Sequence, residues 1–268
     1  MNTAHLLRRP VRLFASTLLL ALTTACVSGG RGTVPTGTLE PDKFLFEKAT
    51  KANNEKKWLV AREYYKQVVD TYTQSPYRPE SKLGVGDTYL NEGTTESLVL
   101  AIAEFREFLT FYPTSAKADY AQYKLALAHF RQMRAAQRDQ TETREAIKEF
   151  EAFVDRYPGS PLINQGRDML RQAKDRLSQA DYEVGYFYFR QRWYPGAVDR
   201  FRTLLTQDPA FTGRDAIYFY LGESLLKVRR PAEALPYYEK LVEEFTMSTY
   251  LPEAKKRIGE LKAQVAAK

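Results

Sequence analysis

Cysteine and histidine are scarce in this chain of 268 residues, which contains one cysteine, Cys26, and two histidines, His5 and His129. A lone thiol cannot form an intramolecular disulfide or a thiolate metal site. His129 lies in the helical pattern YKLALAHFRQM, where a packing or surface role is expected, so no His-based catalytic triad is indicated. No H-E-x-x-H sequence and no Walker-type glycine loop occurs. We therefore expect neither an enzyme nor a site for a metal or cofactor.

Long hydrophobic runs are also absent. The most apolar stretch, LFASTLLLAL from Leu13 to Leu22, is shorter than the roughly 20 residues that a membrane-spanning helix needs. It follows a basic segment and leads into Thr23-Thr24-Ala25. This order of a basic region, an apolar region and small residues is that of a secretory signal, so residues 1–25 are expected to be a signal peptide.

Cys26 directly follows this segment, and the junction resembles the lipobox of bacterial lipoproteins. The resemblance implies that the thiol of Cys26 is lipidated. Thr23 stands where that family favours Leu, Val or Ile, which leaves an ordinary signal peptide with an incidental cysteine as the alternative. Val27 after the cysteine implies sorting to the outer membrane. Residues 26–40, rich in Gly, Thr and Pro, are expected to form a flexible tether.

Acidic residues are in slight deficit, giving a formal net charge of +7. Arg8, Arg9 and Arg12 supply three of these charges, and beyond residue 25 there are 37 basic and 33 acidic residues. A small excess without a basic run is typical of a solvated surface, so nucleic-acid binding is not expected.

Against these absences stands a repeated pattern: an alanine, an aromatic residue at +4, an apolar residue at +7, often an aromatic residue at +11, and commonly Pro at +12. The alanines of the five copies are Ala61, Ala101, Ala146, Ala197 and Ala234. The +4 and +7 spacings place these side chains on one stripe of a helix, and Pro ends the helix. The alanine allows close approach of a second helix, and the ring fills the adjacent space.

A second helical pattern precedes the copies, as in Tyr218, Leu221, Gly222 and Leu225 before Ala234. These offsets are those of the tetratricopeptide repeat, a helix–turn–helix unit. We therefore predict an all-α superhelix of about five helix pairs over residues 41–268. Residues 41–158 would hold the N-terminal repeats, residues 159–250 the C-terminal repeats and residues 251–268 a capping helix. The segment between Ser160 and Trp193 is either one long helix or two helices with a kink near Gly185.

Three strings carry a more specific resemblance: FREFLTFYPTSAKADYAQYKLALAHF, AIKEFEAFVDRYPGSP and KDRLSQADYEVGYFYFRQRWYPGAVDRFRTLL. With the lipoprotein-like start and the irregular repeat lengths, they resemble the BamD (ComL) family of outer-membrane-assembly lipoproteins. The resemblance implies a lipid-anchored scaffold at the periplasmic face of the outer membrane, within the machinery that inserts β-barrel proteins.

The resemblance also implies partners. These are the periplasmic domains of the barrel-forming subunit, unfolded β-barrel substrates and other assembly lipoproteins. Arg200 occupies a position where the family carries an arginine at the subunit contact, and Arg192 and Trp193 are further interface candidates. The alternative for Arg200 is an exposed helix charge. Candidates for a substrate groove are four tyrosines, which could equally belong to the core: Tyr77, Tyr89, Tyr120 and Tyr123.

Two other functions remain open at this point. One is another periplasmic tetratricopeptide protein that coordinates envelope or division processes, although that family usually begins with a coiled coil. The other is a peptidoglycan-associated lipoprotein or a secretion pilotin.

Overall fold

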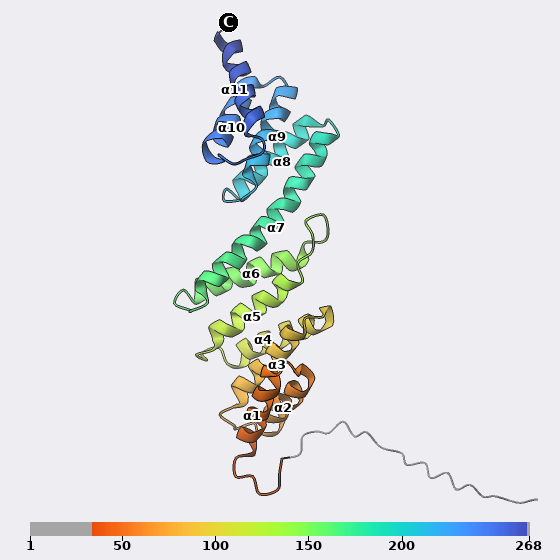
Figure 1. Ribbon diagram of the computed structural model, residues 1–268, viewed down its shortest axis with the longest axis vertical. Helices are drawn as coiled ribbons and strands as arrows, with labels where there is room; N and C mark the ends of the chain where they lie inside the picture. Colours follow the sequence, from red (N-terminus) through yellow and green to blue (C-terminus); the bar gives the residue numbers. More distant parts are fainter. Residues whose placement is uncertain (1–33, 267–268) are drawn as a thin grey trace, which may run out of the picture. The chain divides into compact units, whose positions relative to one another are not determined.

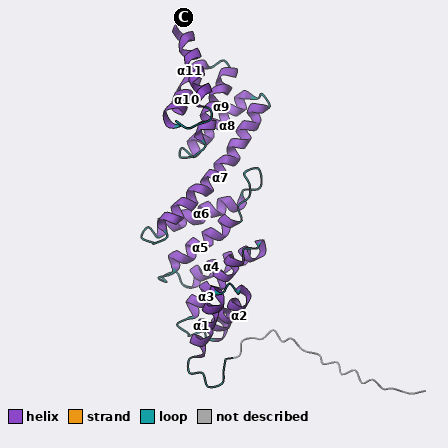
Figure 2. Cartoon of the chain, in the orientation of Figure 1, coloured by secondary structure: helices purple, strands orange, loops and turns teal. Residues whose placement is uncertain are grey.

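The computed structural model describes residues 34–266, in which all regular secondary structure is α-helical (Figures 1 and 2). The expected signal peptide, Cys26 and the first part of the tether lie outside the described residues. Residues 34–40 form no helix before the first repeat. The helices are α1 Pro41–Asn54, α2 Trp58–Thr71, α3 Arg78–Glu92, α4 Thr95–Phe111, α5 Ala118–Arg131, α6 Thr141–Arg156, α7 Ile163–Arg190, α8 Tyr194–Gln207, α9 Arg214–Lys227, α10 Pro231–Glu244 and α11 Leu251–Ala266.

Each helix packs on the next one along the chain, so that the helices form a row of antiparallel pairs. The first helices of successive pairs are also in contact: α1 with α3, α3 with α5, and α5 with α7. The predicted all-α tetratricopeptide superhelix is thereby confirmed. Helix α7 is continuous over 28 residues, packs on α6 and on α8, and so resolves the two alternatives left open for residues 160–193. No helix between residues 34 and 266 combines the length and the apolarity needed to cross a membrane.

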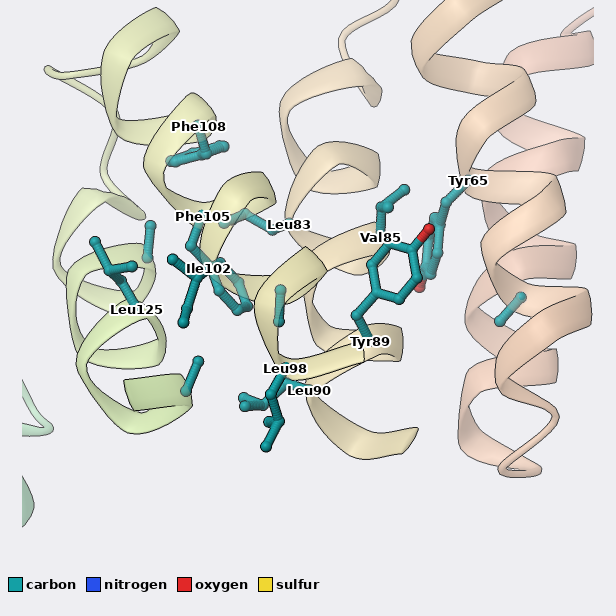
Figure 3. Close-up of a cluster of buried hydrophobic side chains, with 14 of the residues drawn as sticks. Tyr65, Leu83, Val85, Tyr89, Leu90, Leu98, Ile102, Phe105, Phe108 and Leu125 are labelled. Carbon is teal, nitrogen blue, oxygen red and sulfur yellow. The ribbon is translucent and has the colours of Figure 1, made fainter. Parts of the chain in front are cut away.

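The repeated alanines and rings form the contact between paired helices. All five alanines are fully buried, and the rings at +4 are at most 5% exposed. In three pairs the ring lies against a glycine of the preceding helix: Phe105 on Gly86, Phe201 on Gly185 and Tyr238 on Gly222. A Cβ on these glycines would come within 2.5–2.8 Å of the ring, so only glycine permits this approach. Figure 3 shows part of the N-terminal core, including Phe105 and Phe108.

Three turns inside helix pairs share one geometry. Lys56, Arg192 and Arg229 have φ values of 59°, 62° and 62°, and each lies five residues before a repeat alanine. The following N–H donates to the carbonyl five residues back, as from Lys57 to Ala52 at 2.9 Å. This is the Schellman ending of a helix, in which a residue of left-handed conformation reverses the chain. The turn therefore sets the direction of the second helix in these three pairs.

The turns between pairs are also repeated. Four serine hydroxyls accept a hydrogen bond from the N–H two residues later, at 3.1–3.2 Å: Ser75, Ser115, Ser160 and Ser248. Two of these hydroxyls also donate to an aspartate in the first turn of an earlier helix, Ser160 to Asp119 at 2.6 Å and Ser248 to Asp215 at 2.7 Å. The serine thus joins the incoming helix to the pair before it.

Helix α7 is fixed to the C-terminal repeats by an ion pair. Arg171 donates to both carboxylate oxygens of Asp208, and Ser178 donates to Oδ2 of Asp208 at 2.6 Å. Burial alone would raise the pKa of Asp208, but these hydrogen bonds outweigh it and hold the pKa below its usual value. Asp208 occupies the +11 position of its repeat, where other copies have an aromatic residue. Its departure from the pattern therefore provides a polar attachment for the long helix.

We expect Gly222→Ala to lower the free energy of unfolding by about 2 kcal/mol, because the new Cβ would lie 2.5 Å from the buried ring of Tyr238. Chemical denaturation would measure the loss. Gly259→Ala is the matched control, since α11 leaves open space around Gly259, and this change should be neutral or stabilise by up to about 1 kcal/mol. Equal effects of the two substitutions would contradict the role given to the ring–glycine contact.

Candidate partner-binding surface

The end of α7 and the start of α8 form a surface rich in exposed rings. Phe187 and Trp193 are each 56% exposed, and Val184 nearby on α7 is 42% exposed. Large apolar side chains with this exposure in one stretch of chain are a feature of protein-binding surfaces. We call the surface formed by Phe187, Tyr188, Trp193 and Arg200 the α7–α8 surface.

Tyr188 is the centre of this surface. The Trp193 ring packs edge-on against the Tyr188 ring, with centroids 4.7 Å apart and planes at 79°. The guanidinium of Arg200, nearly two turns into α8, lies 5.8 Å from the centroid of Tyr188. A cation above a tyrosine ring is attracted by the electrons of that ring. Tyr188 therefore orients both an indole and a guanidinium that remain accessible to solvent.

The indole also lies close to the backbone of α8. A Cβ at Gly196 would approach the Trp193 ring to 2.9 Å, so the absence of a side chain lets the ring lie on the first turn of α8. Arg192 is exposed and occupies the left-handed turn directly before Trp193. The structure thus brings together the predicted interface residues Trp193 and Arg200, and places Arg192 beside them in the turn.

Arg200 also acts electrostatically on α7. Partial desolvation raises the pKa of Asp181, and the positive charges of Arg144 and Arg200 oppose that rise. No carboxylate forms an ion pair with Arg200 among the described residues. Its guanidinium donors thus remain available to an acidic group of another molecule.

The four predicted groove tyrosines do not form one surface. Tyr89 is 8% exposed and lies beneath the guanidinium of Arg62, 3.7 Å from its ring centroid. Tyr123 is 6% exposed and packs against Phe150 and Phe153. Both are core residues, which corrects their assignment to a groove and agrees with the alternative role. Figure 3 labels Tyr89 among the buried side chains of the N-terminal core.

Tyr77 and Tyr120 are half-buried on the side formed by the first helices of the pairs. Tyr77 stacks on Phe46 of α1, with ring centroids 5.1 Å apart. The Tyr120 hydroxyl donates to Asp87 of α3 at 2.8 and 2.9 Å. Burial and the charge of Asp87 raise the pKa of Tyr120, so its hydroxyl stays protonated. Both residues remain partly accessible.

A larger aromatic cluster was not predicted from the sequence. Its half-buried rings come from α7, α9 and the turn before α11, with neighbouring centroids 4.8–6.5 Å apart: Tyr182, Tyr186, Phe189, Phe219, Tyr220 and Tyr250. The spacing of Tyr182 and Tyr186 by four residues was a signal of a shared helix face. The contact of both with Tyr220 could not be read from spacing, because it joins different repeats.

Comparisons with known proteins found a family model, curated relatives and solved structures that resemble this chain. The family model YfiO, described as an outer membrane lipoprotein, matches residues 39–224. The outer membrane protein assembly factor BamD of Caulobacter vibrioides is 25% identical over 229 residues, which cover 84% of this chain and 73% of that protein. The BamD of Haemophilus influenzae is 23% identical over 266 residues, 95% of this chain and 98% of that protein. The TPR2AB domain of yeast Sti1 in complex with pHSP90 is 14% identical, with 84% of each chain covered and a TM-score of 0.49.

Proposed function

Since this chain belongs to the YfiO (BamD) family of outer membrane lipoproteins, we propose that it is a non-catalytic scaffold that takes part in the assembly of outer membrane proteins. Its finer role is to bind the periplasmic domains of the barrel-forming subunit and to receive unfolded barrel substrates. The proposed binding of the barrel-forming subunit is supported by the α7–α8 surface. There Trp193 and Arg200 are exposed, and both contact the ring of Tyr188.

The chemistry of this surface suits a protein partner. Trp, Tyr and Arg are the residue types that contribute most to binding energy at protein interfaces. Trp193 and Tyr188 already have restricted orientations in the free chain, which lowers the entropy lost on binding. Arg200 adds a directional donor for a carboxylate of the barrel-forming subunit.

Unfolded barrel segments are assigned to the N-terminal repeats. Such segments are extended and carry aromatic residues, and the rings of Tyr77 and Phe46 with the polar edge of Tyr120 and Asp87 offer them stacking and hydrogen bonds. Separate binding faces would let one molecule hold the subunit and a substrate together. Other assembly lipoproteins would bind the remaining exposed faces.

The anchor is proposed from the sequence. Lipidation of Cys26 would attach the chain to the periplasmic face of the outer membrane, because two or more acyl chains hold a protein stably in a bilayer. The following residues up to Glu40 would span roughly 20 Å as a flexible coil. The repeats would then lie near the membrane surface without entering it.

Trp193→Ala combined with Arg200→Glu should lower recovery of the barrel-forming subunit at least tenfold, because the exposed ring and the free cation are both lost. The measurement is co-purification from detergent-solubilised outer membranes. Arg156→Glu, an equal charge change at an exposed position of α6, is the control and should leave recovery unchanged. Undiminished recovery with the double variant would exclude the α7–α8 surface as the binding site.

Tyr77→Ala combined with Tyr120→Ala should weaken the binding of a peptide from a barrel strand that ends in an aromatic residue. Loss of two ring contacts predicts an increase in Kd of about tenfold or more, measured by fluorescence anisotropy. Tyr237→Ala removes a half-buried ring from α10 instead and should not change the Kd. If all variants bind the peptide equally, substrate binding at the N-terminal repeats is wrong.

Cys26→Ser should abolish incorporation of labelled palmitate in cells, since the thiol is the proposed acylation site. Gel fluorography of the immunoprecipitated chain measures the label. Ser28→Ala, close by in the same tether, should retain the label. Palmitate incorporation into the Cys26→Ser chain at the original level would refute the anchor.

A further inference from the structure

The third helix pair contains a buried imidazole with one free nitrogen. His129, near the end of α5, is 5% exposed, and its Nδ1 lies 2.7 Å from Oε2 of Glu142 on α6. Its Nε2 is buried and has no hydrogen-bond partner among the described residues. A buried polar atom without a partner is uncommon in folded proteins and calls for an explanation.

The contact with Glu142 determines the tautomer of this ring. A carboxylate oxygen accepts, so Nδ1 carries a proton, and in the neutral ring Nε2 then carries the lone pair. A carboxylate bonded to one ring nitrogen while the other nitrogen is free is the arrangement that orients metal-binding histidines. His129 is thus prepared to act as a ligand through Nε2.

Two further carboxylates complete the group. Glu145 and Glu149 follow Glu142 by three and seven residues on α6, which places all three on one helix face. The ligand atoms of His129, Glu145 and Glu149 lie within 4.8 Å of one another. Gln122 of α5 donates to Oε2 of Glu149 at 2.8 Å and fixes that carboxylate.

Two basic side chains lie near these carboxylates, but neither forms a close ion pair with them. Lys148 is 3.4 Å from Glu145, and Arg106 is 3.8 Å from Glu149. The side chains of Lys148 and Arg106 are 68% and 56% exposed, so each can turn into solvent when another cation arrives.

We propose that His129 Nε2, together with one oxygen each from Glu145 and Glu149, binds a divalent transition-metal cation such as Zn²⁺. Three protein ligands with nitrogen and oxygen donors suit Zn²⁺, with water as the fourth ligand, and are less suited to Mg²⁺ or Ca²⁺. Sequence reasoning expected no metal and assigned His129 to packing. The cation would join α5 to α6 and stiffen the third repeat.

The test uses Co²⁺ as a spectroscopic probe on the full chain, purified without a histidine tag. All proteins carry His5→Gln and Cys26→Ser, so that His129 is the one imidazole and no thiol is present. Titration with Co²⁺ should produce visible absorption bands that added Zn²⁺ removes. His129→Gln should abolish the bands, and Glu149→Gln should weaken Co²⁺ binding at least tenfold.

Glu151→Gln is the matched control, because Glu151 lies on the same helix but pairs with Lys174, and it should bind Co²⁺ like the parent. Circular dichroism shows whether His129→Gln is folded. If it is not, Glu145→Gln provides the test instead, because that side chain is 38% exposed. The proposal is overturned if the parent shows no bands at millimolar Co²⁺, or if the folded His129 or Glu145 variant binds as the parent does.

Discussion

The structure depends on an aromatic ring that occupies the space left by a missing side chain on the adjacent helix. Phe105, Phe201 and Tyr238 each lie on a glycine of the first helix of their pair, closer than any Cβ would allow. In these three pairs the contact fixes the distance between the helices and buries a large aromatic side chain. Because every pair packs on the next, the positions of all later helices follow from these local distances.

A contact between an aromatic ring and a glycine also occurs at the α7–α8 surface. Trp193 lies on Gly196 at the start of its own helix, whereas the buried rings lie on a glycine of the partner helix, and more than half of its surface is exposed. A ring held in this way keeps one orientation without being buried. The helix pair thereby orients Trp193 and Arg200 together, which would lower the entropy lost if a partner binds there as proposed.

Polar contacts adapt the repeat where the pattern changes. Asp208 stands where other repeats carry a ring, and there it binds Arg171 and Ser178 of the long helix α7. The serine turns and the left-handed turns at Lys56, Arg192 and Arg229 recur at matched positions. These contacts are directional, so they set the angles of helices whose spacing is already fixed by apolar packing.

Much of the fold could be predicted because its signal is local and repeated. The alanine, ring and apolar positions lie within eight residues of one another, and a helix must place them on one face. The exposed residues Arg200 and Trp193 were also named from the sequence as interface candidates, through the family resemblance and not through geometry. The core positions of Tyr89 and Tyr123 were left open, since a ring at a helical spacing fits a groove and a core equally well.

The sequence by itself thus determined the helical class, the number of pairs and the residues that hold each pair together, because adjacent positions on one helix decide these features. Only the tertiary structure decided which rings are exposed, that Tyr188 joins Trp193 to Arg200, and that His129 faces the carboxylates of α6. Those contacts join side chains from different helices or different turns of a helix pair. Their distances depend on how the helices are packed, which no spacing along the chain specifies.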